Sequence, residues 1–166
     1  MDILATGLTQ NTNTYIGRVK ELEIKIVQTD EQLQDAYQVR KEVFVEEQNV
    51  PVELEIDELE KMATHFVGYS EGKPIAASRI RFQNDYGKME RICIRKDFRG
   101  KGYGKDILLF MENYAKENGL NKAKLHGQIQ AEKFYQKLGY KTVSDQFMDA
   151  GIPHVEMIKS LTEWNR

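Results

Sequence analysis

The sequence predicts an α/β (α+β) fold with a mixed, mostly antiparallel central sheet of about six to seven strands and helices on both faces. Three strand-like segments follow one another between residues 65 and 95, joined by short turns rich in Gly and Asn, which is typical of an antiparallel meander. A strongly amphipathic segment then precedes another strand-like segment. A helix that crosses over between two strands makes them parallel, so the sheet is expected to be mixed.

Each element is predicted from a local pattern. Alternation of apolar and polar residues indicates strands, beginning with Ile24 and Ile26, and apolar residues three or four apart indicate helices. Thr29 and Gln32 have the spacing of a capping box before the first helix, and Gly119 is placed just after the longest one. Strands are therefore expected over 23–28, 65–70, 75–82, 88–95, 124–128, 140–143 and 154–161, and helices over 31–45, 102–118 and 131–138, with 53–61 as a short helix or a loop.

The pattern indicates one domain preceded by an arm. Residues 1–20 are polar and rich in Thr and Asn, so we expect a flexible N-terminal arm, or a strand used only in a homodimer. Residues 21–166 form a single domain long enough to bury a core. No apolar run approaches membrane-spanning length, and the N-terminus lacks the pattern of a signal peptide. Because Cys93 is the single cysteine, no intrachain disulfide can form, and we expect a cytoplasmic protein that does not bind membranes.

The net charge of −2 conceals two segments of opposite sign. Residues 88–105 contain seven bases and two acids, whereas residues 42–60 contain eight acids and no base. The basic segment suits an anionic ligand, and the acidic one could attract a cation. Plain solvated surface is the alternative for both. Arg79 and Arg81 could bind a substrate carboxylate, but we favour their pairing with the acids of 53–60.

The glycine-rich turn Arg99-Gly100-Lys101-Gly102-Tyr103-Gly104 lies between a predicted strand and the longest predicted helix. Backbone N–H groups at such a helix start lack intrahelical partners, so they and the helix dipole form an anion site, usually for phosphate. The turn fails the P-loop template, because aspartate stands where Ser or Thr is required, and it fails the dinucleotide template. The spacing of His65, His126, His154 and Cys93 predicts no zinc site, and no metal is expected.

Two motifs stand out: Arg99, Gly102 and Gly104 form an Arg-x-x-Gly-x-Gly pattern, and residues 131–140 (AEKFYQKLGY) form an A-x-x-F-Y-x-K-x-G-F/Y pattern. The first matches the pyrophosphate loop of the GNAT superfamily of acyl-CoA N-acetyltransferases, and the second closely resembles another motif of that superfamily. The segments RKEVFVEEQ (40–48) and GIPH (151–154) are similar to a small bacterial branch, the YjcF-like proteins. The resemblance implies a GNAT-like fold and acetyl-CoA as co-substrate.

The resemblance also implies where the cofactor binds. In the family the fourth and fifth strands splay apart, and pantetheine lies along the fourth strand and bonds to its backbone. The cofactor-binding residues that follow are Ile92, Cys93, Ile94, Arg99, Gly100, Lys101, Gly102, Tyr103, Gly104, Lys105, Gln128 and Phe134. Gln128 stands where many family members have Asn, and its amide can still bond to pantetheine.

The resemblance assigns Tyr135 as the general acid that protonates the departing thiolate. A phenol has an ordinary pKa near 10 and is therefore protonated at neutral pH. Packing of the Tyr135 ring beside Phe134 is the alternative. Cys93 could carry an acyl group, but its place in an apolar strand favours a buried, inert thiol.

The general base is less well determined. Glu90 has the same alternation along its strand as Ile92 and Ile94, so we expect its carboxylate in the cleft; a salt bridge to a neighbouring arginine is the alternative. Further candidates are His65, His126, His154 and a water relay.

The leading functional hypothesis is an N-acetyltransferase that moves an acetyl group from acetyl-CoA directly to a primary amine. The acceptor is a small molecule or a peptide that the sequence does not identify, and the acidic segment 42–60 favours a cationic one. The alternative is an acyl-CoA-binding sensor without turnover. Nucleic-acid binding ranks last, because the basic segment lacks interleaved aromatic residues and the chain is slightly acidic.

Overall fold

The structure, a computed structural model, describes residues 22–162, so the arm predicted for residues 1–20 lies outside the described residues. The strands are β1 (Glu23–Ile26), β2 (Thr64–Ser70), β3 (Lys73–Gln83), β4 (Tyr86–Ile94), β5 (Lys122–Gln128), β6 (Lys141–Thr142), β7 (Phe147–Asp149) and β8 (Ile152–Ser160). The α-helices are α1 (Asp30–Arg40), α2 (Val52–Glu55), α3 (Tyr103–Glu117) and α4 (Glu132–Lys137). A π-helical segment, η1 (Lys41–Glu47), follows α1, and three 3₁₀ segments are η2 (Glu58–Met62), η3 (Lys96–Phe98) and η4 (Ile129–Ala131).

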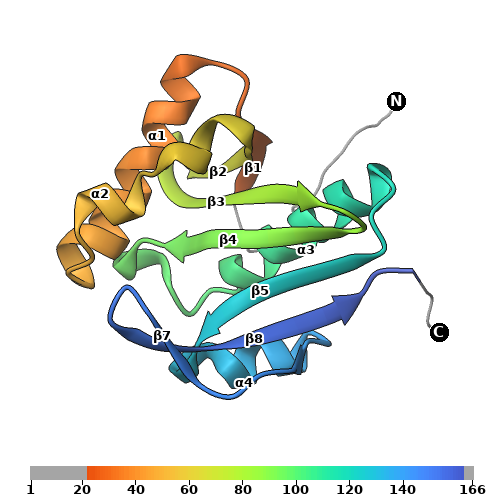
Figure 1. Ribbon diagram of the computed structural model, residues 1–166. Helices are drawn as coiled ribbons and strands as arrows, with labels where there is room; N and C mark the ends of the chain where they lie inside the picture. Colours follow the sequence, from red (N-terminus) through yellow and green to blue (C-terminus); the bar gives the residue numbers. More distant parts are fainter. Residues whose placement is uncertain (1–21, 163–166) are drawn as a thin grey trace.

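The strands form one sheet in the order β1-β2-β3-β4-β5-β8-β6, with β7 paired to β8 (Figure 1). Neighbouring strands are antiparallel except β4 and β5, which are parallel because α3 crosses over between them. The predicted mixed, mostly antiparallel sheet is confirmed. It has eight strands rather than the expected six to seven, and the additional strand is β7. None of the helices within residues 22–162 has the length and hydrophobicity needed to cross a membrane.

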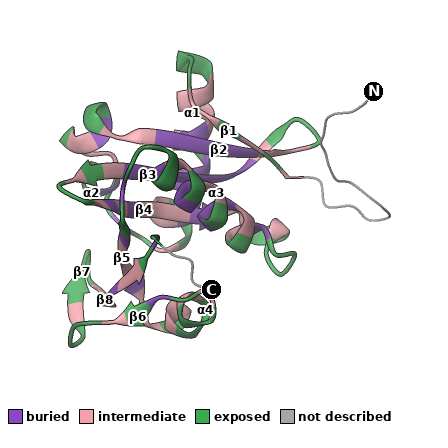
Figure 2. Cartoon of the chain, turned by 90° about the vertical axis from the view of Figure 1, so that its right-hand side faces the viewer, coloured by how far each residue is buried: buried purple, intermediate pink, exposed green. Residues whose placement is uncertain are grey.

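Helices cover both faces of the sheet, as expected. On one face, residues of α3 pack against β2, β3, β4 and β5, including Leu108 and Met111. On the other face, Ala36 and Val39 of α1 pack against Val67, Ala77 and Cys93. Figure 2 shows the buried residues concentrated in β2 and β3, strands that are covered on both sides. Beyond β4, α1 and α2 no longer cover the sheet, which leaves room for a site.

The first helix begins as predicted but ends differently. Thr29 Oγ1 accepts a hydrogen bond of 3.1 Å from the Gln32 N–H, which caps the start of α1. The α-helix stops at Arg40 rather than near Val45, and the chain continues in π-helical form to Glu47. A π-helix has a wider turn than an α-helix, so the side chains after Arg40 are rotated away from the register of α1.

A β-bulge interrupts β4. Ala77 of β3 faces Cys93 and Arg79 faces Glu90, so Arg91 and Ile92 together oppose one residue, and Arg91 has φ +60°. Because a bulge adds one residue to the strand, each side chain after it lies on the opposite face of the sheet from the one that uninterrupted alternation would give.

The strands β4 and β5 separate just before this bulge. Their paired residues run from Tyr86 with Lys122 to Met89 with Leu125, although β4 continues to Ile94 and β5 to Gln128. The backbone of β4 from Glu90 onward therefore has no partner strand on the β5 side. The splay implied by the sequence resemblance is present.

Candidate active site

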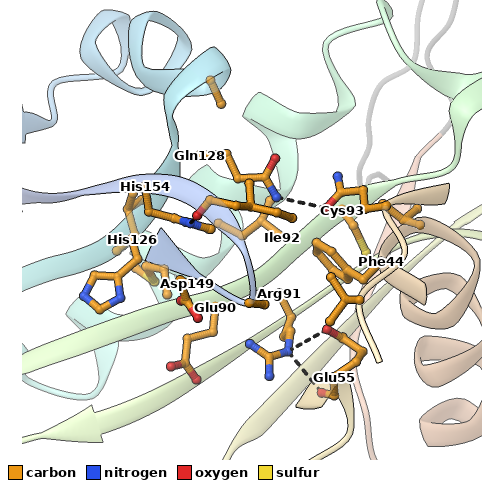
Figure 3. A pocket seen from close by; sticks show the side chains of 18 of the residues that line it. Phe44, Glu55, Glu90, Arg91, Ile92, Cys93, His126, Gln128, Asp149 and His154 are labelled. Carbon is orange, nitrogen blue, oxygen red and sulfur yellow. Dashed lines mark hydrogen bonds and ion pairs between the residues drawn. The ribbon is translucent and has the colours of Figure 1, made fainter. Parts of the chain in front are cut away.

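A cavity of about 700 Å³ opens where β4 and β5 separate (Figure 3). Its walls come from β4, the end of β5, the segment between α1 and α2, the start of α3 with α4, and the tip of the β7–β8 hairpin. Gly104 and Phe134 line the part of it next to the start of α3 and α4, and Glu55 and Asp149 line the part next to α2 and the β7–β8 hairpin. Its size suits a small-molecule site, and we call these the donor end and the acceptor end.

Glycines shape the turn at the donor end. Gly100 and Gly102 have φ of +81° and +85°, left-handed values that other residues rarely adopt. No backbone hydrogen bond found within residues 22–162 uses the N–H of Gly102 or Gly104. These groups lie at the positive end of the α3 dipole, and Lys101 and Lys105 are exposed beside them. The turn therefore keeps the backbone and charge features on which the predicted anion site depends.

The two sequence motifs meet at Gly104. A Cβ atom added there would lie 3.4 Å from Cζ of Phe134, so the Phe134 ring lies directly over the turn. Phe134 is 38% exposed, and the centroid of its ring lies 5.2 Å from that of the neighbouring Tyr135 ring. The motif of residues 131–140 therefore forms the wall next to the motif of residues 99–104.

Two predicted cofactor residues of the turn direct their side chains elsewhere. Tyr103 is buried in the core beside Ile107. The Arg99 guanidinium donates two hydrogen bonds of 2.7 Å to the Glu47 carboxylate, and its Nε donates to the Ile94 carbonyl at 2.8 Å. The hydrogen bonds from Arg99 hold the pKa of Glu47 below its usual value. Arg99 thus connects η1 to the turn, and its side chain is already engaged by Glu47 and Ile94.

Gln128 spans the gap between the separated strands. Its Nε2 donates to Oε1 of Gln48 at 3.0 Å (Figure 3), and its Oε1 accepts from Nε2 of Gln130 at 2.5 Å. The contact with Gln48 connects β5 to the segment that follows η1. A pantetheine amide that bonds to Gln128 has to replace one of these two partners.

The predicted pantetheine strand lines the cavity between the two ends. Ile92, Cys93 and Ile94 all contribute to its wall. The Cys93 thiol points away from α3 into the α1 core, where Sγ lies 3.8 Å from the Ala77 carbonyl. Burial raises the pKa of this thiol to about 12, so it is protonated and a poor nucleophile.

Tyr135 lies on the cavity wall between the donor turn and β5. Its ring packs on Gly127, where an added Cβ atom would lie 3.1 Å from two ring carbons. Burial raises the pKa of Tyr135 to about 12, so the phenol is neutral and can donate a proton. No hydrogen bond from its hydroxyl to another group was found among residues 22–162. The residue is therefore packed in place with its proton available.

The structure corrects the reasoning about Glu90. The bulge at Arg91 breaks the alternation, so Met89 and Ile92 pack on the α3 face while Glu90 lies on the opposite one. The Glu90 carboxylate accepts hydrogen bonds from Arg79 at 2.8 Å and from Arg81 at 2.9 Å. Burial alone would raise its pKa, but the Arg81 hydrogen bonds and the nearby positive charges lower it to about 2. Glu90 lines the cavity, yet a carboxylate with so low a pKa is a weak base.

The acidic segment 42–60 is largely neutralised within the protein. Arg40 is fully buried and donates to the Glu55 and Glu60 carboxylates at 2.8 and 2.7 Å. Arg79 likewise pairs with Asp57 and Glu60, which confirms the expected pairing of this arginine with the acidic segment. Five of the eight acids are ion-paired: Glu42, Glu47, Glu55, Asp57 and Glu60. The segment as a whole therefore does not present a field for a cationic acceptor.

The three histidines differ in position. His65 is buried outside the cavity, and its Nε2 donates a hydrogen bond of 2.9 Å to the Glu60 carbonyl; burial lowers its pKa. His126 and His154 both line the cavity, and Figure 3 shows the His154 side chain directed toward Ile92, whereas the His126 ring lies at the margin. No group of three or more His, Cys, Asp or Glu side chains in the described part of the chain is arranged to hold a metal ion.

His154 has one ring nitrogen engaged. Its Nδ1 lies 2.6 Å from the Ile152 carbonyl oxygen, so Nδ1 carries the proton that is donated. In the neutral ring, Nε2 then has its lone pair available. The Phe147 ring stacks on the imidazole at 6.1 Å between centroids and fixes its orientation.

The β7–β8 hairpin contributes residues that sequence reasoning missed. Asp149 and Ala150 line the cavity, and Asp149 pairs with Ile152 across a turn in which Ala150 and Gly151 have φ of +52° and +77°. These values are those of a two-residue type I′ turn. The sequence signal for this hairpin was Gly151, which stands just before the strand predicted over 154–161. The signal was weak, because β7 is only three residues long and because Pro153 is unusual inside a strand.

The profile of the acetyltransferase (GNAT) domain matches residues 25–161. The chain belongs to the GNAT family. It is 49% identical over 135 residues to YjcF of Bacillus subtilis, an uncharacterised N-acetyltransferase, and the match covers 81% of this chain and 96% of the relative. The predicted likeness to the YjcF-like branch is confirmed.

Solved structures of GNAT proteins have the same fold. An acyl-CoA N-acyltransferase from Pseudomonas aeruginosa has a TM-score of 0.75 and 24% identity, with 84% of this chain and 98% of that one covered. An aminoglycoside 6'-N-acetyltransferase in complex with coenzyme A has a TM-score of 0.71 and 13% identity, with 87% and 99% covered. At these identities the structures show the fold alone. Family membership makes the chain an acyltransferase, and residues of the glycine turn, of the separated strands and of the second motif, Tyr135 among them, line one cavity.

Proposed function

We propose that this GNAT protein transfers an acetyl group from acetyl-CoA directly to a primary amine. The observation that carries the proposal is the neutral Tyr135 phenol on the wall of the cavity that begins at the glycine turn. Such a transfer requires a neutral amine, stabilisation of the tetrahedral oxyanion and a proton for the departing thiolate. Tyr135 supplies that proton.

The donor end suits coenzyme A. The N–H groups of Gly102 and Gly104 would bind the pyrophosphate, and Lys101 and Lys105 would pair with phosphate charge. Because Gly104 has no side chain, a ligand can approach its backbone closely. The unpaired β5-facing edge of β4, from Ile92 to Ile94, would bond to the pantetheine amides.

We assign the general base to His154 instead of Glu90. The Nε2 atom of His154 is free to accept a proton, and the ring lines the acceptor end of the cavity. An amine that arrives as an ammonium ion would lose its proton to this nitrogen before it attacks the thioester carbonyl. Glu90 keeps its negative charge in ion pairs, and its low pKa makes it a weak base.

The test replaces Tyr135 with Phe and His154 with Gln, and uses Tyr114→Phe as the control. Tyr114 packs on Phe66, and its hydroxyl bonds to Thr64, outside the cavity. Free-thiol release with acetyl-CoA and a panel of amines should show kcat reduced by about 10²-fold or more in both variants, the usual contribution of a general acid or base. The Kd for acetyl-CoA, measured by calorimetry, should change less than about threefold, because neither group carries the binding of the pyrophosphate.

Two outcomes would contradict the proposal. If Tyr114→Phe lost as much activity as Tyr135→Phe, the phenol proton would have no special role. If the wild-type protein bound acetyl-CoA but acetylated no amine, the alternative of an acyl-CoA-binding sensor without turnover would hold.

We retain the cytoplasm as the proposed compartment, because Cys93 is a buried free thiol. The homodimer stays a prediction.

A further inference from the structure

Most charges at the acceptor end of the cavity are already compensated. The ion pairs are Glu55 with Arg40 and Arg91, Asp57 with Arg79 and Arg91, and Glu90 with Arg79, Arg81 and Lys88. A ligand that enters this end meets carboxylates that each have a cation within 4 Å. These groups therefore do not select the charge of the acceptor.

Asp149 differs from the other carboxylates of the cavity wall. Within residues 22–162, no ion pair joins it to a lysine, arginine or histidine. Its negative charge acts on a neighbouring residue of the cavity wall, His126. Burial lowers the pKa of His126, and the charge of Asp149 opposes this lowering. Asp149 is exposed at the hairpin tip, so a ligand can reach it from solvent.

The hairpin fixes the position of Asp149 relative to His154. Asp149 pairs with Ile152, and Phe147 pairs with His154, so all four side chains lie on one face of the hairpin. Ile152 and His154 are two residues apart on one strand, which places Asp149 about 7 Å further toward solvent than the proposed base. The cavity is also lined by the apolar side chains of Phe44, Leu54 and Leu59.

We propose that Asp149 binds a second cationic group of the acceptor. The preferred acceptors are then primary amines that carry another ammonium group about 7 Å from the reacting nitrogen, which is the chemistry of diamines and polyamines. A linker of about five methylene groups, with bonds of ~1.5 Å, has this span and would pack on the apolar wall. The proposal rests on the proposed function, because it places the reacting nitrogen at His154.

The experiment compares three acceptors of similar length that differ at the far end: 1,5-diaminopentane, pentylamine and 6-aminohexanoate. The variants are Asp149→Asn and Asp149→Lys, with Asp145→Asn as a control, because Asp145 is exposed in the same connection but does not line the cavity. The wild-type protein and the control should prefer the diamine over pentylamine in kcat/KM by about fivefold to tenfold, as expected for an accessible charge-assisted contact. Asp149→Asn should abolish this preference, and Asp149→Lys should favour 6-aminohexanoate.

Equal use of the three acceptors by the wild-type protein, or an unchanged preference in Asp149→Asn, would overturn the proposal. A wild-type protein that binds acetyl-CoA but acetylates none of them would instead contradict the proposed function. In that case calorimetry with 1,5-diaminopentane on CoA-saturated protein decides the role of Asp149. Binding weakened by Asp149→Asn and not by Asp145→Asn supports it, whereas no binding or equal binding refutes it.

Discussion

Replacement of Glu90 with Gln tests how the charged cluster stabilises the fold. The Glu90 side chain is 12% exposed and is bound by Arg79 and Arg81, with Lys88 Nζ at 3.5 Å. Burial would raise its pKa, but the Arg81 hydrogen bonds and the charges of Arg79 and Lys88 lower it from the ordinary 4.5 to about 2. This difference corresponds to about 3 kcal/mol of stabilisation of the folded state by the ionised carboxylate.

The sign of the effect gives its pH dependence. Because the folded-state pKa lies below the unfolded one, the stabilisation is complete above about pH 5 and is lost as the pH falls toward 2. Glu90→Gln should therefore have a free energy of unfolding lower than wild type by about 3 kcal/mol at pH 7, and the difference should shrink on acidification. Urea unfolding followed by circular dichroism at pH 7, 5, 4 and 3 measures it. The variant should still fold, since domains are usually stable by 5 kcal/mol or more.

Two results would refute this reasoning. A difference in unfolding free energy that stayed constant with pH would show that the carboxylate gains nothing from its ionised form. A fully folded Glu90→Gln protein with kcat reduced about 10²-fold would restore Glu90 as the general base. We expect turnover within about tenfold of wild type, because the geometry of β4 is set by its pairing with β3.

Arg40→Met should lower the free energy of unfolding by about 3–5 kcal/mol, because it leaves Glu55 and Glu60 buried with fewer partners. Lys41→Met is the control, because Lys41 is exposed. If Arg40→Met lowered the free energy of unfolding no more than Lys41→Met does, the buried ion pairs would not stabilise the fold. Gly127→Ala should reduce kcat and leave the acetyl-CoA affinity intact, because the added Cβ would lie 3.1 Å from two ring carbons of Tyr135 and would displace the ring. Combined with Tyr135→Phe it should cause little further loss of kcat, and additive losses would separate the two residues.

Local patterns were sufficient for most of the fold. The crossover helix α3 and the meander β2–β3–β4 depend on periodicity and on turns that neighbouring residues determine. The turn of residues 99–104 was recognisable because Gly100 and Gly102 need left-handed backbone angles. Tyr135 was found through its motif, and the contact between Phe134 and Gly104 explains why the two motifs belong to one site.

The parts that sequence reasoning missed depend on contacts between distant residues. The bulge at Arg91 has no signature in the alternation of β4, and it reversed the inferred face of Glu90. Arg91 is held there by bonds to the Leu54 and Glu55 carbonyls, more than thirty residues away. The same holds for Arg40, whose partners follow it by 15 and 20 residues, so the acidic segment looked unpaired in the sequence.

The bulge in β4 also bears on how such a protein can diversify. Residues before it, such as Lys88 and Glu90, contribute to the acceptor end, whereas Ile92 and Ile94 after it pack with α3 beside the donor turn. One strand thus serves two independent sets of constraints, with a single extra residue as the boundary. For the proposed acetyl transfer, we therefore expect substitutions on the first side to alter acceptor choice while the geometry proposed to bind coenzyme A is preserved, so new specificities need not be acquired at the expense of the donor site.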